Sequence, residues 1–366
     1  GDRYKYLLLP GASEVSVYDE DCEYRLCQNS SFVYLFGVNE PDTYGLIEIN
    51  TGKSILIVDL PDPAKSYWMK VKTIEEYKSE VDIEQVMNLE ELSNMFGNIE
   101  QKTPVLVMGG VHPVSKLKLD CLPKKILEEF NKFAAINYEE QATLIHYDQR
   151  RIKSDEEVQL INSAFLISKS VIEELISFKQ FVNKSEVQVA GHIESILTGL
   201  GNLKTTETIK VLFGSRAGIR NAHNNSLSIL KDQSSIYIEI PCLLKGYNGI
   251  FGTTLYNNNF VDELGILKDL KNLSNSLLES FDEKTSIIKI KDNYSKLIIQ
   301  LLLKYNILKE YNPETDLINI VTRLDDFIFG CGLDCKEIYT NNNSEKLLNK
   351  NEVYFLQFGF YFNNLL

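Results

Sequence analysis

The arrangement of apolar residues in this 366-residue chain changes near Arg150, and this change constrains the fold more than any other feature. Before Arg150, short apolar runs alternate with helical stretches, which is typical of an α/β domain. After Arg150, long amphipathic helices dominate. Because each half is long enough to bury a core of its own, we expect two domains, residues 1–147 and residues 148–366.

The first half contains five apolar runs that predict strands, and one stretch that predicts a helix. The expected strands are residues 32–38, 44–49, 54–60, 104–108 and 143–147. The polar segment 50–53 contains Gly52, which predicts a hairpin turn between the second and third strands. Residues 123–134 place Ile126, Phe130 and Phe133 on one side of an amphipathic helix.

The second half contains two capping-box motifs, which mark the starts of helices. Ser154 with Glu157, and Ser185 with Gln188, each form a capping-box pattern ahead of an apolar helical face. Gly199 and Gly201 predict the end of the second of these helices. The remaining expectations are helices over residues 264–281 and 294–308, strands over residues 236–240, 249–256 and 352–362, and Asn-rich loops at residues 257–259 and 341–343.

Composition excludes several classes of function. The chain has 38 basic and 51 acidic residues, a net charge of −13, and shows no basic stripe with interleaved aromatic residues, so we expect no nucleic-acid partner. No apolar run approaches the about 20 residues of a membrane span, and no signal peptide is expected. The six cysteines do not follow zinc-ribbon spacing, and Cys331 with Cys335 is expected to be a pair of buried thiols. These features favour a cytoplasmic protein that contacts neither membrane nor nucleic acid.

Two groups of motifs, in the same order as in a known family, carry a resemblance. The first runs through residues 28–32 (Gln-Asn-Ser-Ser-Phe), 36–41 (Phe-Gly-Val-Asn-Glu-Pro), 44–45, 51–54, 60–61 and 68–69. The second is an R-x-x-K-[ST]-x-x-E motif formed by Arg150, Lys153, Ser154 and Glu157. The chain resembles prolidases, the Xaa-Pro dipeptidases. The resemblance implies an α/β (α+β) fold, with a creatinase-like N-terminal domain followed by the pita-bread domain that aminopeptidase P and methionine aminopeptidase share.

The resemblance also implies a catalytic centre with two divalent metal ions, usually manganese, which activate a bridging water. Such ions need several carboxylates and an imidazole. The resemblance aligns Glu239 with the first metal aspartate and Ile250, eleven residues later, with the second. Leu333, in the segment 329–333, stands at the metal histidine, and Gln357 stands at a metal glutamate. The fifth ligand has no counterpart up to Leu366, so only Glu239 keeps a carboxylate and we expect no bound metal.

The four histidines of the chain are also assigned from their surroundings. The segment from Gly214 to His223 resembles the family's substrate-side histidine motif, so His223 either lines the site or is an ordinary surface or core histidine. His192 is expected to pack, partly buried, on a helix, His146 to lie in a strand, and His112 in a loop. The acidic residues at 325–326 and 334–337 are expected to form solvated turns, with a different metal site as the alternative.

Three functional hypotheses follow. The first is a non-enzymatic prolidase-like protein, a pseudo-peptidase, whose metal-free pita-bread domain binds a peptide or protein segment or acts as a scaffold. The alternative is an active metal-dependent Xaa-Pro dipeptidase with non-standard ligands. A third hypothesis, compatible with the first, is dimerisation with a second copy or with an active paralogue.

Overall fold

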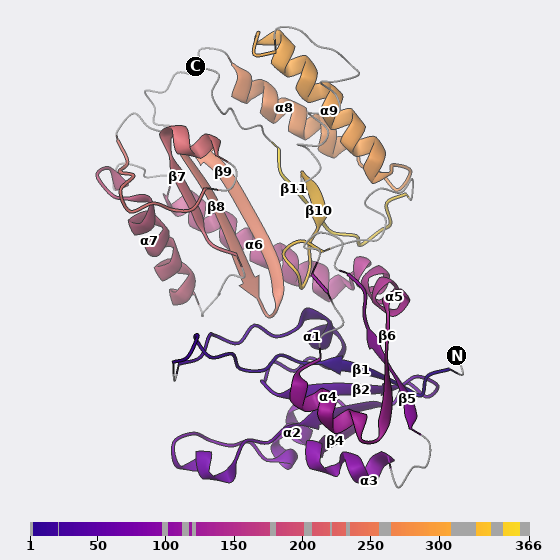
Figure 1. The fold of residues 1–366 in the computed structure, drawn as a ribbon. Helices are drawn as coiled ribbons and strands as arrows, with labels where there is room; N and C mark the ends of the chain where they lie inside the picture. Colours follow the sequence, from indigo (N-terminus) through magenta and orange to yellow (C-terminus); the bar gives the residue numbers. More distant parts are fainter. Residues whose placement is uncertain are drawn as a thin grey trace. The chain divides into compact units, whose positions relative to one another are not determined.

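A computed structural model of the chain divides it into two compact units, Gly1–Tyr147 and Asp148–Leu366 (Figure 1). The structure describes residues 3–20, 22–96, 102–111, 117–118, 122–175, 181–200, 207–219, 222–231, 235–255, 265–308, 327–337 and 347–358. Within these ranges, no helix combines the length and the apolar character that crossing a membrane requires.

The first unit is built on a six-stranded sheet in the order β4-β3-β2-β1-β5-β6. Its strands are β1 (Tyr6–Pro10), β2 (Thr43–Glu48), β3 (Ser54–Val58), β4 (Gln85–Asn88), β5 (Thr103–Met108) and β6 (Ala134–Glu139). The β1, β2 and β3 strands pair antiparallel, whereas the β3/β4, β1/β5 and β5/β6 pairs are parallel. The hairpin turn expected at residues 50–53 joins β2 to β3, and Gly52 there has a positive φ of 74°.

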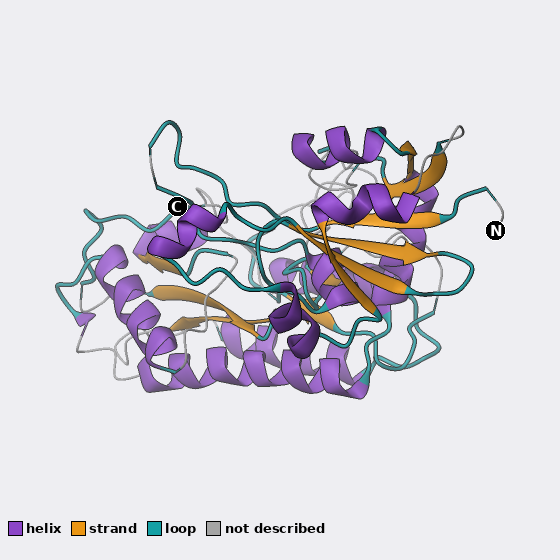
Figure 2. Cartoon of the chain, turned by 90° about the horizontal axis from the view of Figure 1, so that it is seen from below, coloured by secondary structure: helices purple, strands orange, loops and turns teal. Residues whose placement is uncertain are grey.

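Helices lie against this sheet (purple and orange in Figure 2), and apolar residues of α1, α3 and α4 pack on it. The helical elements are α1 (Ser30–Phe36), η1 (Pro63–Tyr67), α2 (Ile74–Glu80), η2 (Leu89–Glu91), α3 (Leu92–Phe96), α4 (Lys124–Asn131) and α5 (Glu140–Arg151). The expected helical face of α4 is confirmed, since Ile126 and Phe130 are buried in one core cluster and Phe133 packs against it. A second cluster joins Phe32 and Phe36 of α1 with residues of β1 and β3.

Two predicted strands of this unit are wrong. Residues 32–38 lie mostly in α1, because the Asn29 side chain accepts hydrogen bonds from the backbone nitrogens of Ser31 (2.9 Å) and Phe32 (3.3 Å), and Gly37 ends the helix in the left-handed conformation. Residues 143–147 lie in α5, where the buried side chains follow helical spacing, at residues 143, 146 and 150. The strand that pairs with β5 on the side away from β1 is β6, which begins nine residues before residue 143.

The second unit contains a three-stranded antiparallel sheet, β7 (Lys210–Phe213), β8 (Ile236–Leu244) and β9 (Tyr247–Leu255). Helices α6 (Asp155–Leu175) and α7 (Glu186–Gly199) cover one face of this sheet (Figure 1). On that face, Ile238 and Ile240 are buried in a cluster with Ile172, Val189 and Ile193. The candidate site residues Glu239 and Ile250 lie on the opposite face of the sheet, which α6 and α7 do not cover.

A second packing group in this unit consists of α8 (Ile266–Glu279), α9 (Ile287–Lys304) and the two-stranded sheet β10 (Ile328–Gly330) and β11 (Tyr354–Leu356). Its core includes Tyr294, whose ring stacks on Phe327 with centroids 4.3 Å apart. Both predicted helices are confirmed here, although α9 begins seven residues before the expected start at residue 294. The predicted strand at residues 352–362 is shorter, because only residues 354–356 pair with β10.

The capping signals of the second unit are confirmed. Ser154 and Glu157 hydrogen bond to each other's backbone nitrogens at 3.2 and 2.7 Å, and Ser185 does the same with Gln188. The strands predicted at residues 236–240 and 249–256 correspond to β8 and β9, which are both longer than expected toward the hairpin that joins them. Gly201 and the Asn-rich segments 257–259 and 341–343 lie outside the described residues.

Gly249 on β9 allows the sheet to approach helix α6 closely. A Cβ atom at this position would lie 2.2 Å from the backbone nitrogen of Phe165 and 2.5 Å from the carbonyl carbon of Ala164. We expect Gly249→Ala to lower the free energy of unfolding by about 1–3 kcal/mol, the usual cost of overpacking, in urea denaturation. Gly252→Ala, on the same strand but exposed, should change it by no more than about 0.5 kcal/mol. Equal effects of the two substitutions would contradict this account.

Candidate functional site

Glu239 and Ile250 lie on the same face of the sheet, the face turned away from α6 and α7. In the β8/β9 register, Glu239 is opposite Gly252 and Pro241 is opposite Ile250. Residues two apart on a strand share a face, and directly opposite residues do too. Glu239 and Ile250 are therefore diagonal neighbours, which is the arrangement that two metal ligands eleven residues apart would require.

The Glu239 carboxylate is buried, and both of its oxygens have partners. Lys210 Nζ donates to Oε1 at 2.7 Å, and the Tyr237 hydroxyl donates to Oε2 at 2.6 Å. Lys210 is the residue directly opposite Glu239 on β7, and Tyr237 is two residues before it on β8. The Glu239 side chain thus forms an ion pair with a residue of the neighbouring strand.

Ile250 and Leu333 are both buried, with 3% and 8% of their surfaces exposed. Leu333 belongs to the segment 331–337, which follows β10 and contacts the start of β9. Asn248, two residues before Ile250, donates its backbone nitrogen to Gly332 O at 2.8 Å and its side-chain nitrogen to Leu333 O at 2.9 Å. The segment that carries Leu333 is consequently hydrogen bonded to the strand that carries Ile250.

Gln357 follows β11 directly, and its backbone nitrogen donates to Phe327 O at 2.7 Å. Phe355, two residues earlier, stacks on Phe329 of β10 with ring centroids 5.1 Å apart. Leu356 and Phe358, the residues on either side of Gln357, pack in the cluster of α8 and α9 instead. By the alternation of strand side chains, Gln357 belongs to the face of Phe329 and Phe355.

His223 is exposed, in a segment held by the buried carboxylate of Glu186. Glu186 accepts hydrogen bonds from Phe213 N at 2.9 Å, Arg216 Nε at 3.0 Å and Asn225 N at 2.7 Å. Arg216 also donates to the backbone oxygen of His223 at 2.5 Å. This network holds the backbone at His223 and at Asn225, while the side chain of His223 is exposed.

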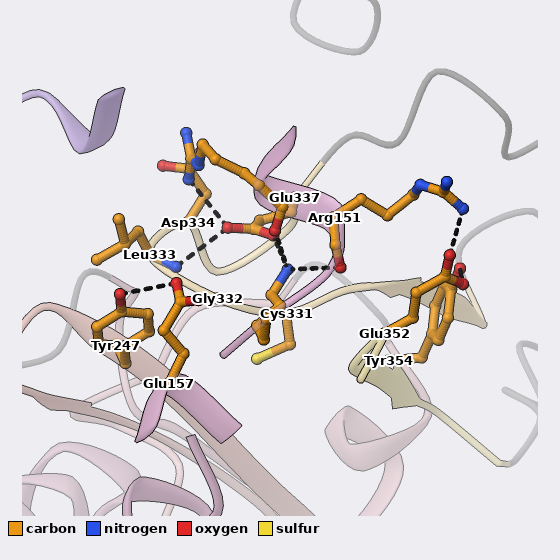
Figure 3. Close-up of polar contacts among 12 residues, drawn as sticks. Arg151, Glu157, Tyr247, Cys331, Gly332, Leu333, Asp334, Glu337, Glu352 and Tyr354 are labelled. Atoms are coloured by element: carbon orange, nitrogen blue, oxygen red, sulfur yellow. Dashed lines mark hydrogen bonds and ion pairs between the residues drawn. The ribbon is translucent and has the colours of Figure 1, made fainter. Parts of the chain in front are cut away.

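The R-x-x-K motif at the start of the second unit holds the segment 331–337 in place, and Figure 3 shows Leu333, Asp334 and Glu337 of this segment. Arg150 Nη2 donates to Asp334 Oδ2 and to Glu337 Oε1, each at 2.9 Å. Lys153 Nζ donates to the other oxygen of Glu337 and, at 2.8 Å, to the backbone oxygen of Arg150. Glu337 Oε1 also accepts from Leu333 N at 3.1 Å. The buried ion cluster Arg150–Lys153–Glu337 thereby fixes the backbone of Leu333.

The electrostatics of this ion cluster follow from burial and proximity. Burial opposes the charge of Arg150, but the attraction of Asp334 and Glu337 outweighs it and raises the pKa of the guanidinium. At Lys153, burial outweighs the attraction of Glu337 and lowers the pKa of the ammonium. Gly332 leaves room for the cluster, since a Cβ atom there would lie 2.3 Å from Glu337 Oε1.

Further polar contacts tie the same region together (Figure 3). The Tyr247 hydroxyl, at the start of β9, donates to Glu157 Oε1 at 2.9 Å. Arg151 forms an ion pair with Glu352, whose other oxygen accepts from the Tyr354 hydroxyl at 2.9 Å. Burial, followed by the charge of Glu352, raises the pKa of Tyr354.

The other candidate residues are placed as follows. His146 lies in α5 and not in a strand, with its ring centroid 5.6 Å from that of Tyr34. His192 lies on α7 as predicted, but it is exposed rather than partly buried, with its ring 5.5 Å from Phe181. The solvated turn expected at residues 334–337 is wrong, because Glu337 is buried in the ion cluster. His112 and the acidic pair at residues 325–326 lie outside the described residues.

The side chains at these positions do not fit a pair of divalent ions. Of Glu239, Ile250, Leu333 and Gln357, only Glu239 offers an ionisable oxygen, and its two oxygens already bind Lys210 and Tyr237. The part of the chain that the structure describes contains no group of three or more His, Cys, Asp or Glu side chains arranged for a metal. Burial raises the pKa of Cys331 to about 12, so this thiol stays protonated at neutral pH.

Comparison with known proteins gives matches in sequence and in structure. Residues 3–107 match the family described as "Aminopeptidase P, N-terminal domain". Human Xaa-Pro dipeptidase is 25% identical over 174 residues, which are 46% of this chain and 34% of the human protein. A probable Xaa-Pro aminopeptidase of Pyrenophora tritici-repentis is 22% identical over 315 residues, 84% of this chain and 65% of that protein. The chain thus spans about a third of the human relative that it matches.

The solved structures extend the likeness to the whole chain. A variant of Escherichia coli aminopeptidase P superposes with a TM-score of 0.78 at 18% identity, covering 98% of this chain and 83% of that one. A putative aminopeptidase P from Bacillus anthracis gives a TM-score of 0.74 at 16% identity, covering 98% and 84%. The fold is therefore the mixed α/β fold of the pita-bread aminopeptidases, as expected. Residues 3–107 therefore belong to the aminopeptidase P N-terminal domain family, and the chain as a whole is similar to Xaa-Pro dipeptidases and aminopeptidases P.

Sequence reasoning missed several residues that hold this region together. The short strand β7 gives no clear sequence signal, so the sequence does not indicate Lys210 as the partner of Glu239. Tyr237 could have been found, since the alternation in Tyr237-Ile238-Glu239 places both polar side chains on one face. Glu337 gave no sequence signal of its burial, because the cations that pair with it are more than 180 residues away.

Proposed function

We propose that this chain is a non-catalytic member of its family, a pseudo-peptidase whose pita-bread domain binds peptide or protein segments. The observation that carries the proposal is the state of the Glu239 carboxylate, which is paired with Lys210 and Tyr237 beside the buried apolar Ile250. A hydrolytic two-metal site requires free anionic ligands at both positions, because a divalent ion must be neutralised where it binds. An active Xaa-Pro dipeptidase with other ligands is the alternative.

We also propose that the protein is cytoplasmic and takes no metal cofactor. It forms a homodimer, or a heterodimer with an active paralogue. The free state of the five cysteines in the described part of the chain supports a reducing compartment. The net charge of −13 supports a partner that is neither nucleic acid nor another strongly acidic surface. Sedimentation of the full chain, alone and mixed with a catalytic relative, distinguishes the two kinds of dimer from a monomer.

The decisive experiment combines metal analysis with hydrolysis. We expect the purified chain, equilibrated with manganese, cobalt or zinc and then dialysed, to retain no stoichiometric metal. We also expect no hydrolysis of an Xaa-Pro dipeptide or of a longer peptide that begins with Xaa-Pro. Two tightly held ions per chain together with hydrolysis would overturn the proposal in favour of the active dipeptidase.

The binding part of the proposal needs its own test, in which the probe is a short fluorescent proline-containing peptide. We expect its fluorescence anisotropy to rise on titration with the protein. The substitution Gly252→Gln should weaken this binding, because Gly252 is exposed and lies directly opposite Glu239. Leu227→Gln, at a residue that is 86% exposed and outside the sheet, is the matched control and should leave it unchanged. Equal binding by both variants would place the peptide elsewhere.

A further inference from the structure

In the ion pair between Lys210 and Glu239, the positive charge beside the carboxylate comes from a side chain of the protein and not from a metal ion. Lys210 is the residue directly opposite Glu239 on β7, so the pairing is fixed by the strand register and needs no unusual side-chain geometry. The side chain of Glu239 is 11% exposed and that of Lys210 is 29% exposed, which shields the pair partly from water. The Tyr237 hydroxyl completes the set by occupying the second oxygen at 2.6 Å.

We propose that the Lys210 ammonium is a built-in counter-ion that takes the place of the family's metal at Glu239 and closes this position to divalent cations. This inference rests on the proposed function, because a working two-metal centre would need the Glu239 oxygens for itself. It also goes further, because it names the residue that neutralises the retained carboxylate.

Two physical arguments support exclusion of a metal by Lys210. A divalent ion at Glu239 would have to displace the ammonium from Oε1, and the displaced positive charge would remain tethered to the adjacent strand. Like charges at such a separation repel strongly where water is partly excluded. Conversely, a buried carboxylate without any cation nearby is unfavourable. If Glu239 is kept while the metal ions are lost, another positive charge must neutralise it.

The first test is a double-mutant cycle in the full chain with Lys210→Met, Glu239→Gln and the two combined. We expect the single substitutions to be non-additive, with a coupling of at least about tenfold in the unfolding equilibrium constant, equivalent to about 1.4 kcal/mol. The matched control is the exposed pair Lys169 and Glu173 on α6, whose atoms are 3.7 Å apart, and whose cycle should show less than about a twofold coupling. Additive effects at Lys210 and Glu239 would overturn the proposal.

The second test asks whether the ammonium excludes cations, using manganese as the probe. A second carboxylate is introduced with Ile250→Asp, with and without Lys210→Met, and the thermal unfolding midpoint is followed against manganese concentration. We expect manganese to raise the midpoint only in the Ile250→Asp/Lys210→Met variant, because two carboxylates then lie on one face and the Lys210 ammonium is gone. The same manganese response in both variants, whether absent or present, would overturn the counter-ion role.

These outcomes separate the counter-ion inference from the proposed function. Hydrolysis and stoichiometric metal in the wild-type chain would defeat the proposed function. An inactive, metal-free wild type combined with an additive cycle, or with equal manganese responses, would defeat the counter-ion alone and leave the pseudo-peptidase proposal in place.

Discussion

Replacing Glu337 with alanine is expected to lower the free energy of unfolding by about 3–5 kcal/mol, the largest effect that we anticipate from a single side chain. The reason is that Lys153 and Arg150, with side chains only 1% and 3% exposed, would lose the buried carboxylate that both of them bind, while Arg150 would keep its bond to the more exposed Asp334. Breaking a buried ion pair by removing one partner costs this much because a charge stays buried without compensation. Urea denaturation of the full chain measures the difference.

Asp334→Asn is the matched control for Glu337→Ala. Asp334 pairs with the same Arg150 nitrogen at the same distance of 2.9 Å, but its side chain is 44% exposed. Exposed ion pairs contribute less than about 1 kcal/mol, so this variant should stay close to the wild type. A Glu337→Ala variant as stable as Asp334→Asn would show that the ion cluster does not stabilise the segment 331–337.

The second large effect is expected for Ile250→Asp, which should lower the free energy of unfolding by about 1–4 kcal/mol, the cost of burying an uncompensated polar or charged group. Ile250 is 3% exposed, and the ammonium of Lys210 on the neighbouring strand is already paired with Glu239. The variant should also show no manganese-dependent hydrolysis of an Xaa-Pro dipeptide, since one added ligand does not rebuild a site of five.

A control for Ile250→Asp introduces the same charge where water can reach it. Leu166 on α6 is 47% exposed, and Leu166→Asp should change the stability by no more than about 0.5 kcal/mol. An unchanged melting temperature of Ile250→Asp, or activity with manganese, would refute the idea that this position is a dry apolar remnant of a metal site.

The fold was predictable where local signals and long-range packing agree. Ser154 and Ser185 start helices as their capping boxes indicate, and Gly52 forms the expected hairpin turn, because each signal acts within a few residues. At residues 32–38 the aromatic and β-branched composition favoured a strand, but a cap at Asn29 and a left-handed Gly37 determined a helix. Local hydrogen bonds outweighed composition there.

The candidate site was predictable only as a set of positions. The spacing of eleven residues correctly indicates that Glu239 and Ile250 belong to one hairpin, and the register places them on one face. What fills the space between such positions could not be predicted, because Lys210 comes from a strand 29 residues earlier and Glu337 meets cations from the start of the unit. Pairings of this kind depend on the folded topology rather than on any local pattern.

Gly332 has a consequence for how this segment can change during evolution. The space that a Cβ atom of Gly332 would fill is occupied by the Glu337 carboxylate, which binds Arg150 and Lys153. A glycine at this position therefore lets Glu337 anchor the segment. The neighbouring residue, Leu333, is held through its backbone nitrogen and oxygen, which every amino acid except proline provides. The backbone atoms of Leu333 thus anchor the segment, and its side chain takes no part in these hydrogen bonds. The side chain at position 333 can therefore be exchanged without any change in the path of the chain.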